Sequence, residues 1–355
     1  MPITNGKYIN PGWINGQPPA INASELNAIS DTLQHLNGIG GSRGGYVVVG
    51  TSTDGATVTT CDFLCDGTAD DVEINAAIQL SEALGMDVLI LAGIYNLENP
   101  LNLYNNVLIV GQNTGATQIA PGIVSPHQTI LRPSLSLNTS LIQAQSYITI
   151  FHMQDLTIEI NDPSSSSSLC LIDLSQTSGC DLLMKNVQLI AISQTGIKMP
   201  ASDLSISAFD SAIPNTAIKD MSRSYFERCS LSEVSFSECG AANATGAQNF
   251  FYLNQFVGDV SLTDCSSCTF IGNTFYGNLT LTSIKNGTGN IICGCNNISS
   301  NLFLSSGGIT LGTNTRYNMV TNNGGVSYGG GSSFTPWAGV TDNGSDNYVA
   351  NNMPT

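Results

Sequence analysis

The sequence predicts an all-β fold, a parallel β-helix in which short strands wind into a stack of coils. From about residue 100 onward, short pieces with alternating apolar residues recur beside a small polar residue, at intervals typical of one coil. Only 10% of the 355 residues are charged, so Ser, Thr, Asn, Gln and Gly must cover the surface, which suits tight turns between strands. One strong helix signal precedes the first buried strand, as a lid would.

The helix signal covers 70–85. Asp70 and Glu73 have the spacing of a capping box, and Gly85 suits the left-handed residue that ends a helix. The apolar residues fall near helical spacing and make one stripe: Ile74, Ala77, Ile78 and Leu84. Residues 88–91 are all apolar and too few for a helix, which is typical of a buried strand. Because one apolar helix face needs a large surface to cover, we interpret the helix as the lid on the open end of the coil.

This part of the chain also resembles a known family. The segment CDFLCDGTADDVEINAAIQ, followed by VLILAGIYNL, is similar to the start of right-handed parallel β-helices in the pectate-lyase-like superfamily. It is most similar to the versions in bacteriophage tailspikes and tail fibres. The motif spans roughly 46–110 and is specific for the fold alone, because this scaffold carries lyases, hydrolases and adhesive proteins. The resemblance implies a right-handed parallel β-helix domain over 46–355 and a homotrimeric tail protein of a virion.

The chain before this domain has a different character. Residues 1–23 are punctuated by Pro and Gly and cannot fold a core alone, but Tyr8 and Trp13 can attach them to another surface. A helix signal then runs to about residue 37. Its apolar residues have the 3-4-3 spacing of a narrow coiled-coil seam: Leu26, Ile29, Leu33 and Leu36. The Gly-rich stretch 38–45 follows as a linker.

A seam this short is marginal in isolation, so we expect copies of itself or a docking partner to stabilise it. The alternative is a helix that packs on the following domain. The sequence NPGWINGQPPAINASELNAIS resembles N-terminal segments of tail proteins from phages and prophages. This resemblance implies that 1–37 attaches the chain to other tail or baseplate proteins.

The charge disfavours two classes of partner. Asp and Glu outnumber Lys and Arg 26 to 10, and the net charge is −16, so we expect neither nucleic acid nor an anionic membrane surface to bind. No apolar run approaches the ~20 residues of a membrane span, and MPITNGKYIN lacks the pattern of a signal peptide. We therefore expect no membrane insertion. The resemblance to phage tail proteins implies assembly in the bacterial cytoplasm before incorporation into the virion tail.

The ten cysteines could form disulfides, bind a metal or pack inside the coil. Without a signal peptide, folding in a reducing cytosol disfavours disulfides. Cys265, Cys268, Cys293 and Cys295 could make a four-thiolate zinc site. The favoured interpretation is that they are small apolar residues stacked at turns inside the coil. The sequence also lacks phosphate-binding and dinucleotide-binding motifs, and we expect neither a metal nor another cofactor.

The repeat predicts where the coils turn. Its later copies centre on Cys229, Asn254, Asn273, Asn296 and Asn314, at intervals of 25, 19, 23 and 18 residues by subtraction of these positions. Asn adopts left-handed turn geometry readily and can hydrogen-bond to an Asn in the next coil. We therefore expect a ladder of stacked Asn side chains along the turns.

Two parts of the chain depart from this rhythm. The span from about 193 to 225 contains Pro200 and Pro214, which disfavour a regular central strand. We expect a loop that stands off the body there, or a coil with a long loop. Near the C-terminus, the pattern of 347–352 predicts a last weak coil, and Trp337 could cover the open end of the core. Equally, this tail could be a distal tip or a contact between subunits.

The irregular span also holds the densest charge of the chain. Half of the ten basic residues are Lys185, Lys198, Lys219, Arg223 and Arg228. The acidic residues in or beside the same span are Asp203, Asp210, Asp220, Glu227, Glu233 and Glu238. The combined polygalacturonase pattern of Asn-x-Asp, Asp-Asp and Gly-His-Gly is absent, so no family motif marks a catalytic centre.

Two functions fit this span. In an adhesive protein, the residues that bind a host-surface glycan would be Lys219, Arg223, Tyr225 and Arg228. In a polysaccharide depolymerase, Glu227 and Glu233 would be the catalytic carboxylates, and Arg223 or Arg228 would orient an acidic sugar. These charges could also be solvated loop residues that pair with one another. We predict a phage or prophage tail fibre or tailspike that binds a host glycan, with the depolymerase, a hydrolase or lyase, as the alternative.

Overall fold

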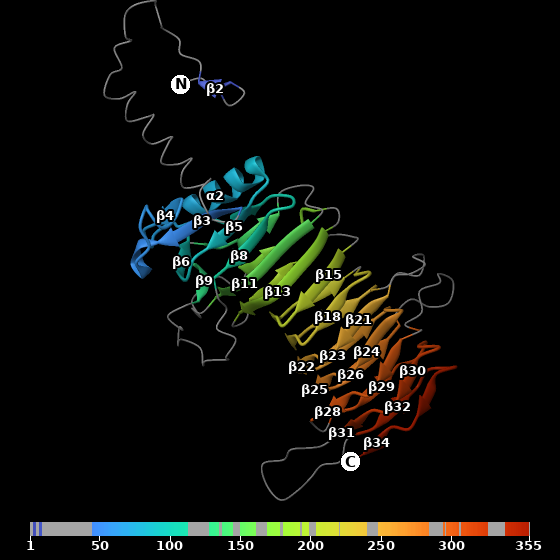
Figure 1. Cartoon of the computed structure of the whole chain (residues 1–355). Coiled ribbons are helices and arrows are strands. Elements are labelled where there is room, and N and C mark those ends of the chain that lie inside the picture. Colours follow the sequence, from blue (N-terminus) through green and yellow to red (C-terminus); the bar gives the residue numbers. More distant parts are fainter. Residues whose placement is uncertain are drawn as a thin grey trace, which may run out of the picture. The chain divides into compact units, whose positions relative to one another are not determined.

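The computed structural model describes residues 3–4, 7–8, 45–112, 128–134, 137–144, 150–160, 169–177, 180–191, 194–198, 204–219, 221–239, 248–283, 294, 296–304, 307–325 and 338–354. The chain divides into two compact units, 1–44 and 45–355 (Figure 1). In the first unit, β1 (Ile3–Thr4) pairs antiparallel with β2 (Lys7–Tyr8). The predicted seam helix and Trp13 lie outside the described residues. Within the described part of the chain, no helix is long and apolar enough to cross a membrane.

The second unit is a coil of short parallel strands with three faces. Face 1 consists of β3 (Tyr46–Thr51), β5 (Asp87–Ile90), β8 (Leu108–Gly111), the first halves of β11 (Ile150–Glu159) and β13 (Cys180–Ile190), β15 (Leu204–Phe209), β18 (Tyr225–Glu227), β21 (Asn249–Tyr252), β24 (Cys268–Ile271), β27 (Asn297–Ser299), β30 (Met319–Thr321) and β33 (Tyr348–Ala350). At the edge of this face, β4 (Phe63–Cys65) pairs with β3, which the 3-10 turn η1 (Ser52–Asp54) follows.

The other two faces continue each coil. Face 2 consists of β6 (Gly93–Leu97), β9 (Thr129–Pro133), the second halves of β11 and β13, β16 (Ala212–Pro214), β19 (Ser230–Ser232), β22 (Gln255–Val257), β25 (Thr274–Phe275), β28 (Leu302–Phe303), β31 (Gly324–Gly325) and β34 (Met353–Pro354). Face 3 consists of two sheets, β7 (Leu101–Leu103), β10 (Ser140–Ala144), β12 (Cys170–Asp173) and β14 (Thr195–Lys198), then β17 (Ala217–Lys219), β20 (Ser235–Ser237), β23 (Val260–Thr263), β26 (Leu279–Thr282), β29 (Ile309–Leu311) and β32 (Val340–Asp342).

Every described strand pair in this unit is parallel, and apart from β4 each strand pairs with the equivalent strand one coil away (Figure 1). The predicted fold, a parallel β-helix, is therefore confirmed. Strands that pair in parallel within one sheet are joined by right-handed crossovers in nearly all known proteins. Residues 347–352, predicted as a last coil, contain β33, whereas Trp337 lies outside the described residues.

The long helix α2 (Asp71–Leu84) is the predicted lid. It ends at Gly85, whose φ of 64° is left-handed, as predicted. Ile74, Ala77 and Ile78 are buried in the same core cluster as β3 and β5, but Leu84 is 47% exposed and lies outside the apolar stripe. Leu84 is the last residue of α2, and its side chain does not pack on the strands.

The predicted capping box is wrong. The N-cap residue Asp70 makes no side-chain bond to the helix, and its carboxylate instead accepts hydrogen bonds from the amides of Gly67 and Asn96, both at 2.8 Å. Asp71 similarly accepts from the amide of Glu98 at 2.7 Å. These acidic side chains therefore connect the start of the lid to β6 and the turn that follows it.

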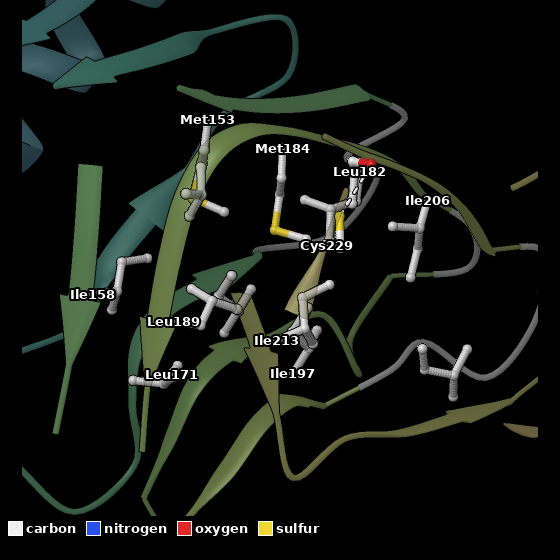
Figure 2. Close-up of a cluster of buried hydrophobic side chains, with 14 of the residues drawn as sticks. Met153, Ile158, Leu171, Leu182, Met184, Leu189, Ile197, Ile206, Ile213 and Cys229 are labelled. Carbon is white, nitrogen blue, oxygen red and sulfur yellow. Dashed lines mark hydrogen bonds between the residues drawn. The ribbon is translucent and has the colours of Figure 1, made fainter. Parts of the chain in front are cut away.

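The core changes character along the coil. Near the lid it is aliphatic and sulfur-rich, and Figure 2 shows Met153, Met184, Leu182 and Ile206 together inside the coil. Further along, aromatic rings replace them in two stacks. One stack joins Phe226, Phe251 and Phe270 at centroid distances of 5.0 and 4.3 Å. The other, Phe256–Phe275–Phe303, has distances of 4.7 and 4.9 Å. Each buried ring adds about 1.5–3 kcal/mol of apolar burial.

The predicted Asn ladder is confirmed at the corner between faces 1 and 2. The backbone amide of each residue donates to the side-chain oxygen of the Asn in the next coil, at 2.9–3.0 Å. The column is Cys229, Asn254, Asn273, Asn301, Asn323 and Asn352. A second column at the corner between faces 3 and 1 contains Asn249, Asn296, Asn318 and Asn347.

Two details of the ladder differ from the prediction. The left-handed residue is the one before each ladder position, such as Leu253, Ser300 and Asn322 with φ of 56–57°. The ladder Asn itself uses its side chain to bridge coils and does not need the turn conformation. Asn296 belongs to the second column, and Asn314 to neither, so the predicted coil boundaries after Asn273 were wrong.

The span that contains Pro214 is a regular coil over 204–219, so the predicted loop is wrong there. β15, β16 and β17 occupy faces 1, 2 and 3, and Ile213 points into the core. Pro214 is tolerated because it is the last residue of a three-residue strand. Its carbonyl accepts a hydrogen bond from the Thr216 hydroxyl at 2.7 Å. Pro200 lies outside the described residues.

Candidate functional site

The outer surface of β15, β18 and β21 on face 1 carries two of the candidate residues, Tyr225 and Glu227, and Arg228 follows at the end of β18. The strand register places Tyr225 beside Phe250 in the next coil, and Glu227 beside Phe209 on one side and Tyr252 on the other. Because side chains alternate along a strand, the intervening Phe226 points into the core and these five point outward. The surface therefore combines aromatic rings with a carboxylate.

The aromatic rings follow the coil axis. The ring centroids of Phe209 and Tyr225 are 5.6 Å apart, and those of Tyr225 and Phe250 are 6.4 Å apart, both pairs tilted. Phe250 is 36% exposed and Tyr252 is 41% exposed. Rings of this kind offer broad faces for C–H groups of a ligand. Sequence reasoning found Tyr225 and missed the other three.

A charged network flanks the rings. Arg228 binds Asp210 through two bonds, Nε to Oδ1 at 2.7 Å and Nη2 to Oδ2 at 3.0 Å, and also pairs with Glu227 through Nη1. The Tyr225 hydroxyl donates to the second oxygen of Glu227 at 3.2 Å. The Arg228 hydrogen bonds hold the pKa of Asp210 below its usual value. Desolvation and then the hydrogen bond to Glu227 raise the pKa of Tyr225.

Three candidate residues occupy left-handed corner positions. Arg223, Arg228 and Glu233 have φ of 51–53°, as does the neighbouring corner residue Asp210 with φ of 50°. All four side chains are exposed, so these charged groups lie at the surface, where a polar side chain is tolerated. The clustering of charged residues in this part of the sequence is therefore partly explained by the turns, which place these side chains at the surface.

The structure does not bring Glu227 and Glu233 together. Glu227 is the last residue of β18 on face 1, whereas Glu233 follows β19 at the far end of face 2. Arg223 precedes β18 and lies at its opposite end from Arg228. Lys219 ends β17 on face 3, opposite Ser237, and its side chain lies outside the described part of the chain.

A separate cluster of possible metal ligands lies at the start of the lid helix. Ligand atoms of Cys65, Asp70 and Glu73 all lie within 4.8 Å of one another. Burial raises the pKa of the Asp70 carboxyl, and it raises the pKa of the Cys65 thiol well above its usual value. Both Asp70 oxygens already accept backbone amides, and the Cys65 thiol donates to the Asp70 carbonyl at 3.8 Å. These bonds serve the attachment of the lid.

The two described cysteines of the possible zinc site are buried in the coil. The Cys265 thiol donates to the carbonyl of Thr263 at 3.4 Å and that of Cys268 to Ser266 at 3.6 Å. This placement matches the interpretation of small residues stacked at turns. Cys293 and Cys295 lie outside the described residues.

No protein-family model and no curated protein matches the chain. Solved structures do resemble it. ORF18 of Geobacillus virus E2 is 15% identical with a TM-score of 0.49, over 94% of this chain and 66% of that chain. The mannuronan C-5 epimerase AlgE4 A-module of Azotobacter vinelandii is 13% identical with a TM-score of 0.43, over 86% and 100%. The endo-xylogalacturonan hydrolase of Aspergillus tubingensis is 12% identical with a TM-score of 0.39, over 81% and 91%. This chain thus spans just under two thirds of the viral protein's length, and its fold assignment rests on the strand register described above.

Proposed function

We propose that the chain is a phage or prophage tail protein, a tail fibre or tailspike, that binds a host-surface glycan on the outer surface of β15, β18 and β21. The observation that carries the proposal is the aromatic group of half-buried Tyr225 and exposed Phe250 and Tyr252, which lies beside the Arg228 network. Sugar rings present C–H groups that pack on aromatic faces, and a few fixed polar groups set their orientation.

The placement of the acidic residues supports binding over cleavage. A glycosidase needs two carboxylates that flank one bond, about 5–10 Å apart. Here the whole width of face 2 lies between Glu227 and Glu233. Both oxygens of Glu227 are already engaged, by Arg228 and by the Tyr225 hydroxyl.

The N-terminal unit completes the proposed role. Residues 1–37 would attach the chain to other tail or baseplate proteins, and the seam predicted from Leu26 to Leu36 would join copies of the chain into a homotrimer. What supports this is the seam spacing and the Tyr8 and Trp13 side chains in a segment that cannot fold alone. The place of action would then be the tail of a virion.

The test is incubation of the purified protein with surface glycans of candidate hosts, measuring retention and any new reducing or unsaturated ends. Tyr252→Ala should lower affinity for the retained glycan at least about tenfold, the loss expected for one stacked ring of about 1.5 kcal/mol. Tyr276→Ala is the matched control, because Tyr276 is similarly exposed, at 45%, but follows β25 on face 2. Equal effects of the two changes, or glycan cleavage that needs Glu227 or Glu233, would overturn the proposal.

A further inference from the structure

We infer that the glycan bound on face 1 is uncharged and carries no carboxylate, sulfate or phosphate group. This inference rests on the proposed function and names the class of its ligand. It departs from the expectation that Arg223 or Arg228 orients an acidic sugar.

Arg228 is already occupied by two carboxylates. Its Nε and Nη2 atoms bind both oxygens of Asp210 at 2.7 and 3.0 Å, and its Nη1 atom binds Glu227. The forked geometry of a guanidinium matches one carboxylate at a time, so a sugar carboxylate could bind in the same way only by displacing Asp210. The Arg228 guanidinium is therefore not available to an acidic sugar.

The charges in and around the Arg228 network balance one another. The network contains two carboxylates, Asp210 and Glu227, and one guanidinium, and Lys185 is the further cation that acts on Asp210. Two negative and two positive groups leave no local excess of positive charge. The whole chain carries a net charge of −16, which repels a polyanion at low salt.

Arg223 is the one described cation of the candidate set that could still serve an acidic ligand. It is exposed, and no described residue forms an ion pair with it. It precedes β18 at the end away from Glu227 and Tyr252. A single exposed cation, screened by water, contributes little to binding. Arg223→Gln is therefore the change that separates the two classes of ligand.

The remaining contacts suit a neutral sugar. Tyr252 and Phe250 supply exposed ring faces, which attract C–H groups regardless of ligand charge. Glu227 accepts one bond on each oxygen, and a carboxylate has about four acceptor positions, so it can accept hydrogen bonds from sugar hydroxyls. The surface thus offers acceptors and rings, which match the hydroxyl donors and apolar faces of an uncharged pyranose.

The test compares matched ligands on the full-length protein: mannan and glucan oligosaccharides as neutral probes, and oligogalacturonides before and after chemical reduction of their carboxylates to alcohols. We expect retention of a neutral probe or of the reduced oligogalacturonide. The affinity for that uncharged probe should change less than about twofold between low and high salt. Salt screens interactions between exposed charges, and an uncharged ligand makes none. Arg223→Gln should leave this affinity unchanged, whereas Tyr252→Ala should weaken it at least about tenfold.

Retention of only the carboxylated form, with affinity that falls as salt rises and is lost in Arg223→Gln, would overturn the inference and leave the proposed function standing. Failure to retain any probe or any host glycan, with correct folding shown by circular dichroism, would overturn both. Tyr276→Ala again serves as the control for general damage to the surface.

Discussion

The side chain of Asn273 joins three coils, because its Oδ1 accepts the backbone amide of Asn254 at 2.9 Å and its Nδ2 donates to Oδ1 of Asn301 at 2.9 Å. Nδ2 also donates to the carbonyl of Phe251 at 2.9 Å. Asn273 is 1% exposed, so water cannot replace these bonds. At this corner, each coil is therefore held in register with the next by one buried Asn side chain.

Asn273→Ala should lower the free energy of unfolding by about 3–5 kcal/mol, since it leaves several buried donors and acceptors unpaired at about 1–3 kcal/mol each. Chemical denaturation followed by circular dichroism measures the loss. Thr280→Ala, on the outer surface of β26, is the control and should change stability by less than about 0.5 kcal/mol. An effect of Asn273→Ala as small as the control's would show that the ladder does not hold the coils in register.

The corner residue Glu233 should accept glycine and reject a β-branched side chain. Its φ is 51°, and its amide donates to the carbonyl of Val257, so it stacks on Gly258, the left-handed residue of the next coil. Glu233→Gly should change the free energy of unfolding by less than about 1 kcal/mol, because relief of strain offsets the entropy of the unfolded glycine. Glu233→Val should cost about 1–2 kcal/mol more than Glu233→Gly. Thermal melting of both variants measures the difference, and equal melting temperatures would contradict it.

The fold could be predicted from local pattern because each coil repeats the same physical requirement. Gly85 and the apolar stripe fixed the lid, and the recurring polar residue indicated the turns. The position of the turn could not be predicted to the residue: the left-handed residue precedes the ladder Asn, and residues as different as Leu253 and Ser300 occupy it. The backbone conformation at these corners is imposed by the stacking of one coil on the next. The sequence of a single coil therefore does not reveal it.

The candidate surface was predicted in part for a similar reason. Tyr225 lies in the charge-rich span, but its neighbours Phe209 and Phe250 are 16 and 25 residues away in the sequence by subtraction. Coils of unequal length hide such pairs until the register is known. For the same reason, Glu227 and Glu233 were predicted to form one catalytic pair. They are only six residues apart in the sequence, and the sequence does not reveal the corner that places them on different faces of the coil.

The ion pair between Asp210 and Arg228 should stabilise the protein in a defined pH range. Arg228 holds the pKa of Asp210 below its ordinary value of 3.8, so the folded state binds this proton less readily than the unfolded state. The contribution is therefore fully present above pH 3.8 and is lost as the pH falls through the lower folded value. Asp210→Asn should be less stable than the natural protein by under about 1 kcal/mol near neutral pH, since the pair is exposed. The gap should close in acid, and a gap that widens as the pH falls would contradict this assignment.

The ring of Tyr225, and not its hydroxyl, should contribute to glycan binding. The hydroxyl donates to Glu227, an internal bond of the network, whereas the ring lies between Phe209 and Phe250. Tyr225→Phe keeps the ring and should retain affinity within about twofold, while Tyr225→Ala removes the central aromatic face and should weaken binding about tenfold. Isothermal titration with the retained glycan measures both. If Tyr225→Phe lost as much affinity as Tyr225→Ala, the hydroxyl or the Glu227 position that it fixes would be the binding determinant. The ligand would then be held chiefly by hydrogen bonds to the charged network.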